Sequence, residues 1–204
     1  MLNTSLFQTD ASGQLDTPPG QAGPALGIVI PVQYGVIARA AAFPLEMNFL
    51  KSSDDKSLNA HNSSLIECLA ILSAVIRWPR SFYRKTVIFI TDNLSLSMNY
   101  KKGRPRGLYL CYTLRCLYNA AARLSCDLHI TWQARCSSKY SVIADQLSHQ
   151  DFVNVPEAIT YRVIEPLPQP IRQTLVTSCD FSKHTFSQMW SRIEQYWKSN
   201  LKPL

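Results

Sequence analysis

Four acidic residues in this 204-residue chain stand beside or inside apolar stretches, where a charged carboxylate is unfavourable: Asp10, Glu67, Asp92 and Asp145. Glu67 is the only charge in residues 65–76, and Asp92 directly follows the β-branched run 87–91. A buried carboxylate needs a cation, a hydrogen-bond network or a metal ion to offset its lost hydration. Mg²⁺ prefers oxygen ligands, and two such ions ~3.5–4 Å apart support phosphodiester hydrolysis. The four acids therefore predict a site for two divalent ions, Mg²⁺ or Mn²⁺.

These acids also have a purely structural interpretation, as helix caps and loop residues. Glu67 follows Ser64 by three positions, which is the spacing of a capping box at the start of a helix. A chain with 14 acids will place a few of them near element ends by accident. Four acids at such positions in this order favour the metal site.

Periodicity predicts the elements that would position these acids. Short apolar runs predict strands, and longer runs with helical spacing predict helices. We expect strands at 5–10, 25–31, 35–40, 87–90 and 126–132, and helices from 63 to before Pro79 and at 94–100, 108–125 and 142–149. This order is typical of a mixed five-stranded sheet flanked by helices. Asp10 and Asp92 would then lie at the ends of central strands, and Glu67 and Asp145 on helices.

The character of the chain changes after Phe152, so we expect an α/β domain over 1–152 and an appendage over 153–204. Prolines 156, 166, 168 and 170 predict an extended connector. An amphipathic helix follows, with an apolar face formed by Phe186, Met189, Trp190, Ile193 and Trp197. That face either packs on its own domain or forms an interface with a partner domain.

Composition narrows the range of partners and cellular locations of the protein. The net charge of +7 favours an anionic partner such as nucleic acid, although a basic protein without such a partner has the same composition. The six cysteines lack paired spacings, which favours reduced core thiols over disulfides or a zinc site. We find no apolar run of the ~18 residues that a membrane span needs, and no signal peptide. We therefore expect an intracellular protein without a membrane partner, in the nucleus or the cytosol.

Each of the four acids lies in a short motif. The motifs are Thr9-Asp10-Ala11-Ser12-Gly13, Ser64-Leu65-Ile66-Glu67-Cys68-Leu69-Ala70-Ile71, Thr91-Asp92-Asn93 and Val142-Ile143-Ala144-Asp145-Gln146-Leu147-Ser148. Together they resemble the ribonuclease H domains of retroelement reverse transcriptases. The likeness is strongest to the tyrosine-recombinase retrotransposons of the DIRS and Ngaro group, where a Pro-rich connector and a Trp-containing segment also follow the nuclease.

This resemblance covers roughly residues 3–152. It implies the ribonuclease H fold, dependence on two divalent ions held by the four acids, and cleavage of the RNA strand of an RNA–DNA hybrid. It further implies a part of a retrotransposon reverse transcriptase, with the polymerase domain as a partner, or a gene derived from one.

Basic and polar residues near the acids are candidates for binding the hybrid. Lys101, Lys102, Arg104 and Arg106 form a basic segment that we expect to contact phosphates, the alternative being a solvated turn. Ser12 and Asn93 adjoin catalytic candidates and are placed to donate to the 2′-hydroxyl of RNA. Arg135 is the last substrate-binding candidate.

Two positions depart from the family pattern before the last acid. Arg135 stands where the family often has a histidine that assists proton transfer or product release, and Ser141 stands where it has asparagine. Neither family residue is a metal ligand, so these departures predict slower turnover with the ions retained.

The two departures also keep open a second interpretation, a catalytically weak or inactive module that binds nucleic acid or scaffolds a polymerase. An integrase-type nuclease fits less well, because Glu67 precedes Asp92 here while that group has the order D, D, E.

Overall fold

The structure is a computed structural model that describes residues 4–11, 25–31, 37–44, 63–105, 107–134, 139–150, 162–164, 166–177 and 183–200. Its elements in chain order are β1 (Thr4–Ala11), β2 (Ala25–Pro31), β3 (Ile37–Pro44), α2 (Ser63–Arg77), the short 3-10 helix Pro79–Ser81, β4 (Thr86–Thr91), α3 (Leu94–Lys102), α4 (Leu108–Arg123), β5 (Asp127–Trp132), α5 (Lys139–Ser148), β6 (Arg162–Ile164), α6 (Gln169–Thr177) and α7 (Lys183–Asn200).

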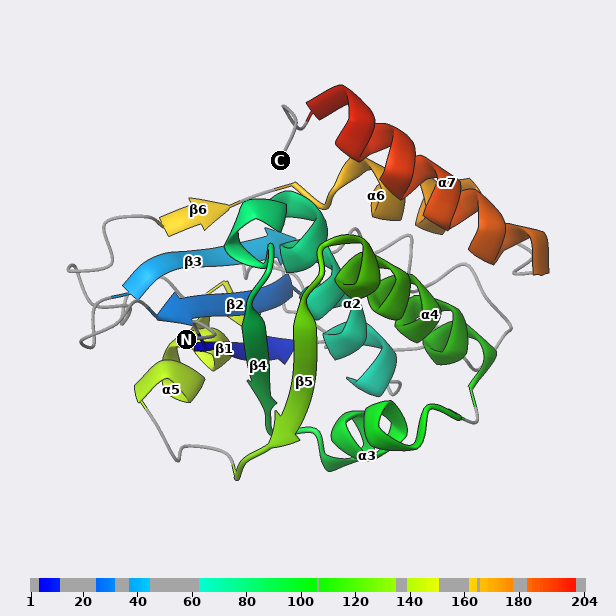
Figure 1. Cartoon of the computed structure of the whole chain (residues 1–204). Helices are drawn as coiled ribbons and strands as arrows, with labels where there is room; N and C mark the ends of the chain where they lie inside the picture. Colours follow the sequence, from blue (N-terminus) through cyan, green and yellow to red (C-terminus); the bar gives the residue numbers. More distant parts are fainter. Residues whose placement is uncertain are drawn as a thin grey trace, which may run out of the picture.

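The strands form one mixed sheet in the order β5-β4-β1-β2-β3-β6 (Figure 1). β1 pairs in parallel with β4, and β4 with β5, while β2 is antiparallel to both of its neighbours. The expected mixed five-stranded sheet flanked by helices is therefore confirmed. A sixth short strand, β6, pairs in parallel with β3 at the edge of the sheet. It comes from a segment in which we expected only a connector.

Helices cover the two faces of the sheet unequally. α2 and α4 lie on one face, where Leu26 and Ile28 of β2 join the main core. α5 lies on the other face, over β1, β2 and β3, and forms a smaller core with Ala25 and Val29. This alternation along β2 is what a strand with both faces covered requires. Because every residue from Ser64 to Ile76 is buried, α2 is the central helix of the domain.

Gly27 explains how α5 packs so closely on the sheet. A β-carbon at this position would lie 2.1 Å from the carbonyl oxygen of Ala144 and 2.8 Å from the backbone nitrogen of Ser148. No side chain fits there, so glycine lets the helix backbone rest directly on β2. Gly27 is also the direct partner of Asp10 on β1. The close contact therefore brings the middle of α5 to the strand pair that carries Asp10.

Three expectations about element boundaries need correction. The third strand spans Ile37–Pro44 instead of 35–40, because the buried run Ala40–Phe43 continues it along β2. The last core helix begins at Lys139 instead of 142. The expected extended connector is wrong for Gln169–Thr177, which is helical. Pro170 is compatible with that helix because it lies in the first turn, where a backbone N–H has no partner within the helix.

The C-terminal helix α7 packs on its own domain, as the first of our two interpretations proposed. Met189, Ile193 and Trp197 are buried in the main core. The indole nitrogen of Trp197 donates to the carbonyl oxygen of Ile76 at 3.2 Å, in the last turn of α2. Phe186 lies in α7, but its side chain is outside the described part. The boundary expected at 152/153 also lies outside the described residues.

The described cysteines agree with the expectation of reduced thiols. Cys68, Cys111, Cys116 and Cys126 are free, and burial raises the pKa of Cys126 to about 11. Cys136 and Cys179 lie outside the described residues.

Within the part of the chain that is described, every helix is too short or too polar to cross a membrane.

Candidate active site

Three of the four predicted acids come together in the structure. One oxygen from each of Asp10, Glu67 and Asp92 lies within 4.8 Å of the other two. β1 and β4 are neighbours with Gln8 level with Ile90, and two further steps along this register place Asp10 beside Asp92. Neighbouring strands lie ~4.8 Å apart, so these two carboxylates meet at the same edge of the sheet. α2, packed on β1, supplies Glu67.

Asp145, the fourth predicted acid, is placed differently. Among the described residues it is not part of the three-carboxylate group. It lies on α5 one position after Ala144, whose carbonyl rests on Gly27 across from Asp10. Its side chain is 38% exposed, and one carboxylate oxygen lies 3.8 Å from Nε2 of His149, one turn along the helix. The packing of α5 thus places the residue before Asp145 on the strand pair that carries Asp10, while Asp145 itself is not part of the group of three.

Glu67 is the most strongly perturbed of these acids. Burial raises its pKa to about 8, hydrogen bonds from Thr91 and Asn93 lower it, and the charges of Asp10 and Asp92 raise it. Without a cation, burial therefore favours the protonated form of Glu67. A divalent cation among the three carboxylates would compete with that proton and favour the ionised form.

The donor set of this cluster fits a hard divalent cation. All three groups are carboxylates, and Asp10 and Glu67 are only 6% and 3% exposed. Oxygen-only ligands suit Mg²⁺ and Mn²⁺, whereas zinc sites favour nitrogen and sulfur. Cys68 lies next to Glu67 in sequence but is buried in the core between the helices, where burial raises the pKa of its thiol.

Sequence reasoning missed the groups that hold the cluster in place. The Thr91 hydroxyl donates to Oε2 of Glu67 and accepts the backbone N–H of Asn93 at 3.1 Å. The indole of Trp132 donates to the backbone oxygen of Asp92 at 3.1 Å. Thr91 lies inside the Thr-Asp-Asn motif, so a hydroxyl beside a strand-end acid was the available signal. Nothing local in the sequence pointed to Trp132, which is 40 residues away from Asp92.

The predicted substrate-binding residues fall into two sets. Lys101, Lys102 and Arg104 are exposed at the end of α3, where Gly103 adopts a left-handed conformation with φ of 63° and ends the helix. Asn93 is the N-cap of the same helix and accepts the N–H of Leu96 at 2.8 Å. The remaining candidates lie outside the described residues: Ser12, Arg106 and Arg135.

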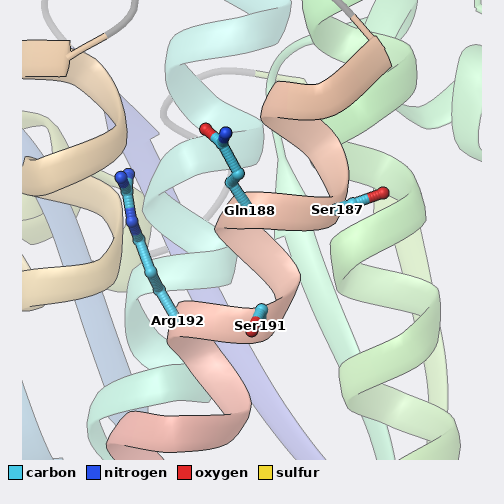
Figure 2. A pocket seen from close by; sticks show the side chains of 4 residues that line it. All are labelled: Ser187, Gln188, Ser191 and Arg192. Carbon is cyan, nitrogen blue, oxygen red and sulfur yellow. The ribbon is translucent and has the colours of Figure 1, made fainter.

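The structure also contains a polar hollow on α7, remote from the acids. It is lined by Ser187, Gln188, Ser191 and Arg192 (Figure 2). Arg192 extends toward α6, where Nη1 donates to the hydroxyl of Thr174 at 3.3 Å. The three acids include Asp92, which follows β4 in sequence, and the end of β4 that leads to α3 points away from α6 and α7 (Figure 1). This hollow is therefore separate from the acid cluster.

Comparison with known proteins identifies the fold. No family model and no curated protein matches the chain. Among solved structures, ribonuclease H1 of Halobacterium salinarum NRC-1 is 14% identical, with a TM-score of 0.53 over 73% of this chain and 97% of that one. LC11 ribonuclease H1 from compost is 13% identical, with a TM-score of 0.51 over 74% and 96%. The foamy viral protease-reverse transcriptase in complex with an RNA/DNA hybrid is 16% identical, with a TM-score of 0.50 over 74% of this chain and 20% of that one. The chain therefore has the ribonuclease H fold.

Proposed function

We propose that this chain is a divalent-metal-dependent endoribonuclease that hydrolyses the RNA strand of RNA–DNA hybrids inside the cell. The observation that carries the proposal is the group of three carboxylates, Asp10, Glu67 and Asp92, at one edge of a ribonuclease H fold. The similar foamy viral and compost proteins have each been solved with an RNA/DNA hybrid, which supports this choice of substrate.

The proposed division of labour follows from the positions of the residues. Asp10, Glu67 and Asp92 hold two Mg²⁺ or Mn²⁺ ions, and Asp145 completes the set from α5. When bound, such ions lower the pKa of a coordinated water and stabilise the charge that develops on phosphate oxygens. Lys101, Lys102 and Arg104, with Arg106 and Arg135, contact phosphates and position the hybrid without reading its bases.

The resemblance in sequence motifs supports a more specific origin. We propose that the chain belongs to a retrotransposon reverse transcriptase of the DIRS or Ngaro type, or to a gene derived from one. A polymerase domain would then be its partner. The foamy viral neighbour supports such a partner, because the chain matches only 20% of that protease-reverse transcriptase.

Cleavage of a labelled RNA–DNA hybrid in Mg²⁺ or Mn²⁺ tests the proposal. We expect Asp92→Asn to abolish cleavage. The matched control is Asp127→Asn, because Asp127 is an aspartate on the neighbouring strand β5 whose side chain is 64% exposed and paired with His129. This control should cleave at the wild-type rate. Equal cleavage by the wild type and Asp92→Asn would disprove the proposal, as would a wild type that is inactive with either metal.

A second candidate function is that of a catalytically weak or inactive domain that binds nucleic acid. The position of Asp145 outside the three-carboxylate group favours it, together with Arg135 and Ser141 in place of the family residues. It predicts salt-sensitive hybrid binding without metal-dependent cleavage. Anisotropy of a labelled hybrid at increasing salt, measured beside the cleavage assay, separates the two functions.

A further inference from the structure

Asn93 connects two helices directly beside the acid cluster. Its side-chain oxygen accepts the N–H of Leu96 at 2.8 Å in the first turn of α3, and the hydroxyl of Ser64 at 3.1 Å in the first turn of α2. Its side-chain nitrogen donates to the hydroxyl of Ser63 at 3.0 Å. The bond from the Leu96 N–H fixes the orientation of the amide, because a backbone donor must face the oxygen.

These contacts belong to a closed ring that includes Glu67. The backbone N–H of Asn93 donates to the hydroxyl of Thr91, and that hydroxyl donates to Glu67. Glu67 lies three residues after Ser64, on the same face of α2. The ring therefore runs from Glu67 through Thr91 and Asn93 to Ser64 and back along the helix. It ties the Glu67 helix to the turn that carries Asp92.

Most of the hydrogen-bonding capacity of the Asn93 amide is used by this arrangement. An amide offers two acceptor sites and two donor hydrogens. Both acceptor sites are occupied, by Leu96 and Ser64, and one donor is taken by Ser63. A 2′-hydroxyl that donates to the side-chain oxygen of Asn93 would have to displace Leu96 or Ser64.

We propose that Asn93 is a positioning residue that fixes Glu67 relative to Asp92, and that it does not read the 2′-hydroxyl of the RNA strand. This inference rests on the proposed function and revises the sequence expectation for Asn93. Outer-shell partners of metal ligands typically change metal affinity by 10–100-fold when they are removed. Loss of the Asn93 bridge should have an effect of this size on divalent-ion binding, because Glu67 would no longer be held against the other two acids.

The test uses Asn93→Ser. Serine is a good N-cap, so α3 keeps its cap, but its short side chain cannot reach Ser63 and Ser64 from across the turn. Mn²⁺ affinity is measured on the whole protein alone by electron paramagnetic resonance. We expect affinity to fall about 10–100-fold, and saturating Mn²⁺ to restore part of the cleavage rate. The preference for an RNA–DNA hybrid over a DNA duplex of the same sequence, measured by anisotropy in Ca²⁺, should stay at the wild-type value.

Two further variants make the test decisive. Ser64→Ala removes one bond of the ring at a residue that is only 8% exposed, so a loss of Mn²⁺ affinity there cannot come from lost substrate contact. It should weaken Mn²⁺ binding in the same direction as Asn93→Ser. Asn119→Ser, at an exposed asparagine on α4, controls for the substitution itself and should match the wild type.

Two results would overturn the inference: unchanged Mn²⁺ affinity in Asn93→Ser, or a loss of its preference for hybrid over DNA duplex. Failure of the proposed function looks different, because it is a wild type that binds Mn²⁺ and does not cleave the hybrid.

Discussion

Asp10, Glu67 and Asp92 are held by buried neighbouring elements, whereas Asp145 stands on a half-exposed face of α5. The first three are positioned by strand register, by a buried helix, by the hydrogen bond from Thr91 to Glu67 and by the bonds between Asn93 and the start of that helix. Asp145 is placed by the packing of α5 on the sheet, which is closest at Gly27, and it has His149 beside it. We therefore expect a rigid half of the site at Asp10, Glu67 and Asp92, and an adjustable half at Asp145. We expect the rigid half to bind a divalent ion by itself, and the α5 half to control how well the complete site works.

Removal of one acid from each half is the most direct test of whether the two halves differ. Asp92→Asn should lower hybrid cleavage by more than about 10³-fold, above the range of an outer-shell partner. Asp145→Asn should lower it by about 10–100-fold and leave Mn²⁺ binding by the protein alone nearly intact. Cleavage rates and Mn²⁺ titrations of both variants measure this. Equal losses of Mn²⁺ affinity would show that the two halves are not distinct.

The pH dependence of stability sharpens the description of the rigid half. Burial raises the pKa of Glu67 from 4.5 to about 8 in the folded chain, so the folded state binds more protons than the unfolded state between these values. The contribution of Glu67 to the stability of the metal-free protein should therefore be fully present below pH 4.5. It should be lost as the pH rises through about 8. At about 1.4 kcal/mol per pKa unit, the loss amounts to several kcal/mol.

Glu67→Gln tests this dependence, because glutamine keeps the shape and cannot ionise. Urea unfolding between pH 5 and pH 9 should show the variant gaining stability over the metal-free wild type as pH rises. Saturating Mg²⁺ should narrow the gap, since it stabilises only the wild-type carboxylate. A constant difference at all pH values would contradict the raised pKa.

Much of the rigid half could be predicted from the sequence because its signals are local. Asp92 follows an apolar run rich in β-branched residues, and Glu67 is the only charge in the apolar run 65–76. The register that sets Asp10 level with Asp92 could not be predicted, because it depends on which strands become neighbours. The same is true of Trp132 and of the bridge from Asn93 to Ser63 and Ser64, which join distant parts of the chain.

In the C-terminal region, less of the structure could be predicted from the sequence. The apolar spacing in α7 correctly indicated a packed face, since the stripe repeats at helical intervals. α6 was missed because the prolines before and within it, at 166, 168 and 170, favour an extended chain, although a proline in the first turn of a helix loses no hydrogen bond. β6 was missed because three residues carry too little pattern to predict a strand. Short elements of this kind are fixed by the sheet edge or helix that they join.

Gly27→Ala tests the adjustable half by moving α5. The added carbon would overlap the carbonyl of Ala144, so the helix must shift, at about 1–3 kcal/mol of unfolding free energy. Cleavage should fall with it while Mn²⁺ affinity stays close to that of the wild type. The matched control is Gly107→Ala, where the nearest atom lies 3.9 Å away in ordinary contact. If Gly27→Ala cleaved at the wild-type rate despite its lower stability, the contact at Gly27 would have no part in placing Asp145.

Trp197→Phe should have the smallest effect, because it alters a contact with the C-terminal end of α2. Glu67 lies near the other end of that helix. The indole supplies a donor to the Ile76 carbonyl, one of the last carbonyls of α2, which lack partners within the helix. Loss of this buried hydrogen bond should lower the unfolding free energy by about 1 kcal/mol. Trp190→Phe, at a half-buried indole on the same helix, should cost less. Because α2 is fixed along its whole length by buried contacts, Mn²⁺ affinity and hybrid cleavage should not change in Trp197→Phe. A drop in either would mean that α7 helps to hold Glu67 in place, and that the rigid half of the site extends to the C-terminal helix.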